Sequence, residues 1–111
     1  MISSFQKFRS LYVRSLFALM LTLGTASADE ILAKSKGCFT CHSMDTKGFP
    51  SPTFKEIARK YRGTKDIIPK MVKRIMFGGG KPVWIPGVVK PGNPQVTEQE
   101  ATVLAKWILG L

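Results

Sequence analysis

Two cysteines and one histidine fall within five positions of the sequence, in the run Cys38-Phe39-Thr40-Cys41-His42. The 111-residue chain has no other cysteine and no other histidine, so chance composition is a poor explanation for this clustering. Thiols and imidazole serve in redox chemistry, in metal binding and in cofactor attachment. The order and spacing of the three residues must decide among these uses.

The pattern C-x-x-C-H is typical of covalent haem c attachment. In that chemistry both thiols add to the haem vinyl groups, and the imidazole of the following residue binds the iron. The two-residue spacer matches the distance between the vinyls, and the covalent links position the histidine. We therefore predict one covalently attached haem c, held by Cys38 and Cys41, with His42 as the proximal iron ligand.

Three other sites use the same residue types: a thioredoxin-like dithiol, half of a zinc site and a structural disulfide. A redox dithiol is expected near a βαβ pattern, which this sequence lacks. Structural zinc needs four ligands, whereas the motif offers three. A disulfide across so short a loop adds little stability. Haem attachment is favoured over all three.

Helical periodicity predicts the elements that position the motif. The predicted helices cover residues 29–36, 53–62 and 65–77, and the last begins at position 97. Thr53 with Glu56, and Thr97 with Glu100, have the spacing of capping boxes. No alternating strand pattern of useful length appears, so the predicted fold is all-α.

Proline and glycine predict two loops, at residues 43–52 and 81–94. The mature chain is short, and apolar burial alone leaves it a thin margin over chain entropy. A covalently bound haem would supply a large apolar surface for the core. The expectation is therefore about four helices and long loops wrapped around one haem.

Residues 1–28 are predicted to be a signal peptide and residues 29–111 a single domain. Lys7, Arg9 and Arg14 form a basic segment, residues 16–23 are apolar, and residues 26–28 are small. A retained membrane anchor is the alternative, but the uncharged run 15–28 is shorter than the roughly 20 residues of a spanning helix. The mature protein is expected in the periplasm or otherwise exported, without stable membrane insertion.

The mature chain is basic. Three of the 17 lysines and arginines precede position 29, which leaves 14 against 7 acidic residues. This charge favours redox partners with acidic docking surfaces. The alternative is that the lysines only keep a small protein soluble. Nucleic acid is a poor fit, because no nucleic-acid-binding motif is present.

With these residues in view, the chain resembles the class I c-type cytochromes, particularly the small bacterial electron carriers. The resemblance runs through the mature chain in five segments: 36–42, 51–55, 73–75, 81–84 and 104–109. It implies that the Pro52 carbonyl accepts a hydrogen bond from the haem-ligating imidazole. It also implies that Arg74 and Trp84 donate hydrogen bonds to a haem propionate. Trp107 is expected to have a structural role, packing near Ile31 and Leu32.

The sequence departs from this family at the second iron ligand. Relatives supply a methionine from the proline-rich loop, where this chain has Val89, give or take one position. Lys90 at the loop tip and Met76 on the preceding helix are candidate distal ligands. A distal side with no protein ligand, lined by Val88 and Val89, is the third possibility.

Two functions follow from these alternatives. The first is a one-electron carrier, free or acting as the haem subunit of an exported oxidoreductase, and not itself an enzyme. The second is a binder or sensor of nitric oxide, carbon monoxide or a similar small ligand at an open haem. A haem enzyme such as a peroxidase is disfavoured, because the chain has no second histidine for acid-base chemistry.

Overall fold

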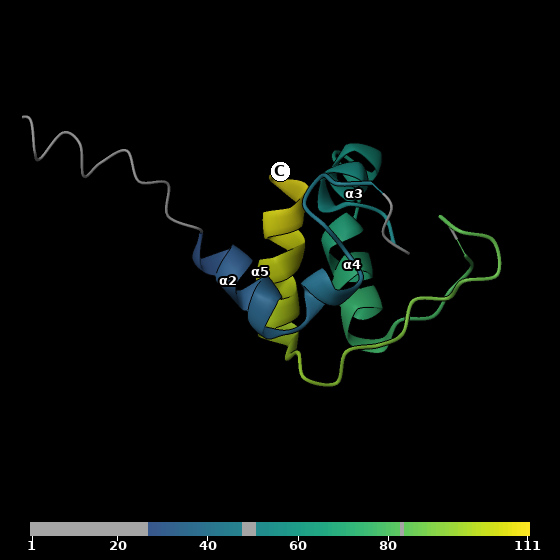
Figure 1. The fold of residues 1–111 in the computed structure, drawn as a ribbon. Coiled ribbons are helices and arrows are strands. Elements are labelled where there is room, and N and C mark those ends of the chain that lie inside the picture. Colours follow the sequence, from purple (N-terminus) through teal and green to yellow (C-terminus); the bar gives the residue numbers. More distant parts are fainter. Residues whose placement is uncertain (1–26, 48–50, 83) are drawn as a thin grey trace, which may run out of the picture.

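The computed structural model describes residues 27–47, 51–82 and 84–111 and shows a small bundle of helices joined by long loops (Figure 1). Most of the predicted signal peptide lies outside these residues. The helices are α2 (Ala28–Ser35), η1 (Cys38–Thr40, a 3-10 turn), α3 (Phe54–Tyr61), α4 (Ile67–Phe77) and α5 (Glu98–Leu109). Four α-helices without strands in the described part confirm the all-α prediction. None of the described helices is long and apolar enough to cross a membrane.

Side-chain caps set the starts of three helices. Both predicted capping boxes are present, with Thr53 at the start of α3 and Thr97 at the start of α5. The Ser27 hydroxyl caps α2 by accepting the Glu30 N–H at 3.1 Å, so this helix begins one residue earlier than predicted. Cleavage after Ala28 would remove that cap.

Helix α4 begins at Ile67, two residues after the predicted start. Asp66 precedes it in the left-handed region, with φ 55°, and this conformation ends the preceding turn. Pro69 is the third residue of the helix. Because the first-turn N–H groups have no partner within a helix, proline is tolerated there as predicted.

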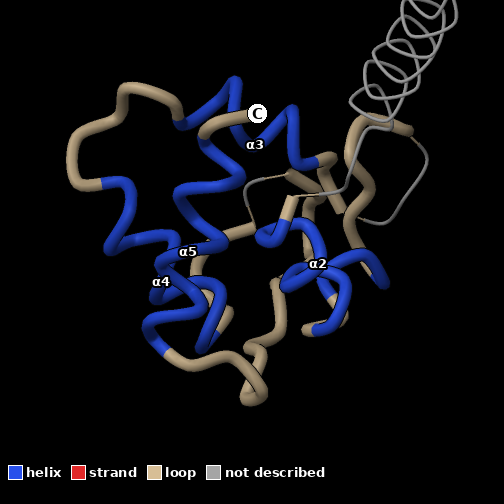
Figure 2. The backbone as a smooth tube through the Cα atoms, turned by 90° about the vertical axis from the view of Figure 1, so that its left-hand side faces the viewer, coloured by secondary structure: helices blue, strands red, loops and turns tan. Residues whose placement is uncertain are grey.

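Helix α5 forms the centre of the bundle, and α2, α3 and α4 pack against it (Figure 2). It buries one face, made by Ala101, Leu104, Ala105 and Ile108. Phe54 from α3 and Leu104 are the largest fully buried side chains among the described residues. Trp107 packs edge-on against Phe54 with ring centroids 5.2 Å apart. Of the two predicted neighbours of Trp107, Ile31 is 58% exposed, whereas Leu32 packs against the hydrophobic core as Trp107 does.

Candidate haem-binding site

One tight turn carries the two cysteines and the histidine. Gly37 follows α2 in the left-handed conformation, with φ 75°, and turns the chain into η1. The Cys38 carbonyl accepts the N–H groups of Cys41 and His42 at 3.4 and 3.1 Å. Cys38 is half-buried, Cys41 is exposed, and both thiols are free. The sequence pattern does not predict this 3-10 turn, which together with the two residues after it presents all three side chains.

A short hydrogen bond orients the His42 ring. Its Nδ1 lies 2.7 Å from the Pro52 carbonyl oxygen. Since a carbonyl can only accept, Nδ1 carries the proton, and the lone pair of Nε2 remains available to a metal. Burial lowers the pKa of His42; the Pro52 carbonyl acts in the opposite direction, and the nearby Lys90 charge lowers it further. The neutral imidazole, which is the metal-binding form, is therefore favoured.

Backbone pairing between the two residues after the motif and the start of α3 holds Pro52 in place. The Phe54 and Lys55 N–H groups donate to the carbonyls of Ser43 and Met44 at 2.9 and 3.2 Å. The Phe54 ring also stacks on the imidazole of His42, with centroids 5.2 Å apart and planes 28° apart. This stacking was not expected from the sequence, where Phe54 appears only as one apolar position of an amphipathic helix. The ring thus connects the site directly to the core.

The end of the proline-rich loop, residues 90–93, is fixed to two other elements, and we call it the loop anchor. The Gly79 N–H donates to the Lys90 carbonyl at 2.8 Å, and Gly78 pairs with Pro91 in an isolated antiparallel bridge. The Asn93 side-chain amide donates to the Lys36 carbonyl at 2.8 Å. The loop anchor therefore ties the end of α4 to the residue just before the cysteine turn.

Gly78→Ala should cost about 2–4 kcal/mol of unfolding free energy, whereas Gly79→Ala next to it should cost about 1 kcal/mol. Both glycines have positive φ, 64° and 75°, so both variants are strained. At Gly78 an added Cβ would also lie 2.2 Å from the Lys90 carbonyl oxygen, whereas at Gly79 it meets nothing within 4 Å. Denaturant unfolding of the haem-loaded proteins measures both changes. Equal losses in the two variants would contradict a close-packed anchor.

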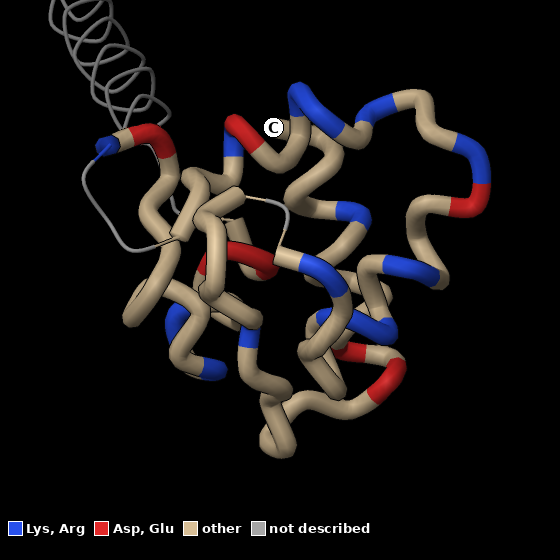
Figure 3. Tube along the Cα trace, turned by 90° about the vertical axis from the view of Figure 1, so that its right-hand side faces the viewer, with Lys and Arg blue, Asp and Glu red and all other residues tan. Residues whose placement is uncertain are grey.

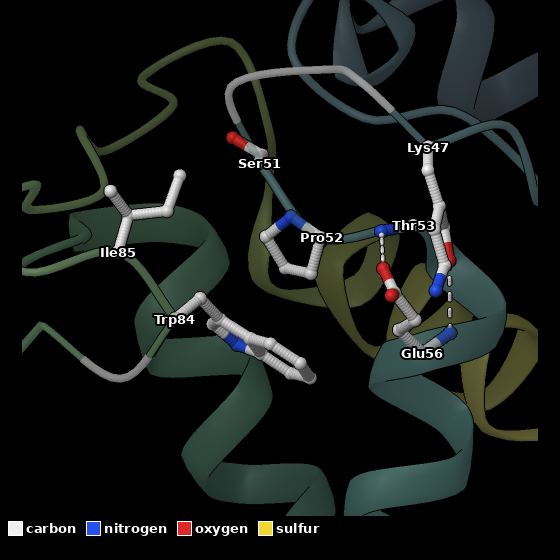
Figure 4. A pocket seen from close by; sticks show the side chains of 7 residues that line it. All are labelled: Lys47, Ser51, Pro52, Thr53, Glu56, Trp84 and Ile85. Atoms are coloured by element: carbon white, nitrogen blue, oxygen red, sulfur yellow. Dashed lines mark hydrogen bonds between the residues drawn. The ribbon is translucent and has the colours of Figure 1, made fainter.

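Trp84 and Pro52 lie on the same pocket (Figure 4). The pocket has a volume of about 220 Å³, and its other lining residues are Lys47, Ser51, Thr53, Glu56 and Ile85. Trp84 is 38% exposed, and the Lys60 ammonium lies 4.7 Å from the centroid of its ring. This cation–π contact stabilises the orientation of the indole ring that lines the pocket.

Arg74 and Lys90 lie close to each other on the side where the loop anchor meets α4. Residues 78–80 are three consecutive glycines, which we call the glycine run. A Cβ added at Gly80 would lie 2.7 Å from the Arg74 guanidinium, so the Arg74 side chain rests on the glycine run. Burial lowers the pKa of Lys90, the neighbouring cysteines act in the opposite direction, and the Arg74 charge lowers it further. The arrangement brings two cations to one side of the site.

The remaining distal candidates lie elsewhere. Met76 on α4 is partly buried and packs against the hydrophobic core, as an ordinary core methionine does. Val88 and Val89 are each 52% exposed, and neither lines the pocket described above. In the described part of the chain, no three His, Cys, Asp or Glu side chains come together as a metal-binding group.

The residues of the turn fit a covalently attached haem. They offer two free thiols and one imidazole whose Nε2 is unused, in the order that attachment requires. The family model for cytochrome c matches residues 29–111 of the chain. The chain belongs to the cytochrome c family. Members of this family carry covalently attached haem c and transfer electrons, so this is a small single-haem electron-transfer cytochrome and not an enzyme.

Known cytochromes are similar to this one over most of their length. Cytochrome c-552 of Hydrogenobacter thermophilus is 39% identical over 98 residues, which cover 86% of this chain and 96% of the relative. Cytochrome c-551 of Stutzerimonas stutzeri is 42% identical over 94 residues, covering 85% and 86%. The crystal structure of wild-type Nitrosomonas europaea cytochrome c552 has a TM-score of 0.65 at 35% identity, covering 72% of this chain and 95% of that one. These similarities place the cytochrome among the small class I proteins.

Proposed function

We propose that residues 29–111 form an exported one-electron carrier in which Cys38 and Cys41 hold the haem and His42 binds its iron. The observation that carries this proposal is the bond between His42 Nδ1 and the Pro52 carbonyl at 2.7 Å. It fixes the ring, increases the basicity of the opposite nitrogen and leaves that nitrogen free. Since both thiols lie on the same turn, one small unit supplies the covalent links and the proximal ligand.

Arg74 and Trp84 are proposed to donate to a haem propionate. Arg74 rests on the glycine run after α4, and Trp84 lies at the pocket that Pro52 also lines. Both groups donate hydrogen bonds, and a partly buried propionate needs such partners to remain ionised. The chain itself therefore supplies the polar contacts that would orient the haem edge.

The basic surface supports transient docking to acidic redox partners. Lysine and arginine positions are spread over several helices and loops on the face shown in Figure 3. Only three of the described lysines form ion pairs, namely Lys34, Lys36 and Lys55, so most basic side chains in this part of the molecule are free to act on a partner. Exposed charges of one sign raise association rates at low salt. The same surface would also fit a haem subunit docked on a larger oxidoreductase.

The test begins with the full-length chain produced in a bacterium that attaches haem c. The periplasmic fraction should yield a protein with the mass of residues 29–111 plus one haem, and it should cycle reversibly by one electron. Electron exchange with a small acidic redox protein should slow as salt is raised from low to physiological ionic strength, because screening shortens the range of attraction.

Three outcomes would count against parts of this proposal. If the haem-loaded protein is found in the membrane fraction and still contains residues 1–28, the assignment of a cleaved signal is overturned. Exchange rates that do not depend on salt would overturn the acidic-partner assignment. Stable copurification with a large enzyme would favour the subunit role over a free carrier.

A further inference from the structure

The loop anchor fixes the backbone of Lys90 between the end of α4 and the chain before the cysteine turn. Its backbone is fixed by the Gly79 N–H, which donates to the Lys90 carbonyl at 2.8 Å. Three residues later, the Asn93 side-chain amide donates to the Lys36 carbonyl at 2.8 Å, shortly before the turn begins. The segment that carries Lys90 is thus attached both to α4 and to the chain just before Cys38.

The side chain of Lys90 is half-buried, on the loop end that is fixed to the chain before the cysteine turn. Burial raises the pKa of the Cys38 thiol and lowers the pKa of the His42 imidazole, and the positive charge of Lys90 lowers both. Its Nζ donates to the Pro91 carbonyl at 2.9 Å, and it forms no ion pair with a carboxylate of the described residues. Burial without an acidic partner among the described residues lowers the pKa of this amine, so Lys90 loses its proton more readily than an exposed lysine does.

The other candidate iron ligands in the described part of the chain are already held by other contacts. Met71 is buried in the core, and Met76 packs against it. Met44 comes only two residues after His42, and it packs against the core as well. The Asn93 amide uses its nitrogen on Lys36 and its oxygen on the Gln95 N–H at 3.1 Å. Lys90 is the remaining side chain near the motif that could bind the iron.

We propose that the Lys90 amine is the second axial ligand of the haem iron, on the face away from His42. This inference rests on the proposed function, because it requires haem at the motif. Ligation is a binding step without oxidation or reduction: the ammonium gives one proton to water, and the nitrogen lone pair forms the bond to iron. An amine in place of a thioether lowers the reduction potential, because methionine ligation is what raises it in this family.

Spectroscopy of the purified haem-loaded protein tests the assignment. The wild-type ferric protein should be low-spin, and Lys90→Ala should convert it to a high-spin form. The affinity of Lys90→Ala for added imidazole should rise at least about tenfold, because the internal ligand no longer competes. Lys90→Met should stay low-spin and show a higher reduction potential, so it reports on ligation even if Lys90→Ala folds poorly.

Lys81→Ala and Lys81→Met are the matched controls, since Lys81 is an exposed lysine of the same loop, and both should leave the spectrum unchanged. Met76→Leu should also leave it unchanged. A Lys90→Ala spectrum identical to that of wild type, a wild-type ferric protein that is already high-spin, or a spectrum altered by Met76→Leu would each overturn the assignment of Lys90. Failure of the proposed function is a separate result, because the wild-type protein would then contain no covalently bound haem.

Discussion

Replacing Cys38 and Cys41 together with serine should abolish covalent haem attachment, and acidified acetone should then extract any haem that remains with the protein. Serine keeps the size and polarity of the side chains but cannot form a thioether. The single variants Cys38→Ser and Cys41→Ser should each retain at most one covalent link. Mass spectrometry under denaturing conditions, combined with the pyridine haemochrome spectrum, counts these links directly.

Ser35→Ala and Ser43→Ala are suitable controls, because they change small polar side chains next to the same turn without touching a thiol. Both should keep two covalent links. Haem that stays attached in the double cysteine variant would show that another residue holds it. A disulfide between Cys38 and Cys41 in the wild-type protein after maturation would also contradict the attachment.

Phe54→Ala should destabilise the haem-loaded protein by about 3–5 kcal/mol, which is the usual cost of removing a buried phenylalanine from a core. Phe54 is 2% exposed. Its ring contacts Phe39, His42 and Trp107, each with ring centroids 5.2 Å apart. The cavity would therefore open between the core and the His42 ring. For a domain of this size, each kcal/mol lowers the melting temperature by about 4–8 °C.

Phe77→Ala provides the matched control, because Phe77 at the end of α4 is 69% exposed. This variant should stay within about 0.5 kcal/mol of wild type. Melting curves of both variants, followed by circular dichroism and by absorbance of the haem, separate loss of the fold from loss of iron ligation. Similar melting temperatures for the two variants would show that Phe54 is not the link between core and site.

Much of the fold could be predicted because its signals are local. The capping boxes at Thr53 and Thr97 are four-residue patterns whose partners are fixed by helix geometry, and both are present. The apolar spacing of the last helix fixed the face that is buried, which includes Ala101, Leu104, Ala105 and Ile108. Boundaries were less accurate. A polar cap at Ser27 and a left-handed residue at Asp66 moved two helix starts by one and two residues.

The contacts around the motif depend on pairs of residues far apart in the chain. Nothing local indicates that Asn93 reaches Lys36, or that Gly78 pairs with Pro91. From the sequence, the glycine run after α4 predicts only the end of a helix. In the structure it provides space for the backbone of the loop anchor, since a Cβ at Gly78 would overlap the Lys90 carbonyl.

The sequence by itself determined the chemistry of this protein, because C-x-x-C-H places two thiols and an imidazole within one turn whatever surrounds them. It left three candidates for the distal side, since helix periodicity and loop composition do not say where a loop side chain points. The tertiary structure gives each candidate a different environment. It packs Met76 against the core and leaves Val88 and Val89 exposed. It fixes the backbone of Lys90 near the cysteine turn, because the Gly79 N–H donates to the Lys90 carbonyl and the Asn93 side chain donates to the Lys36 carbonyl.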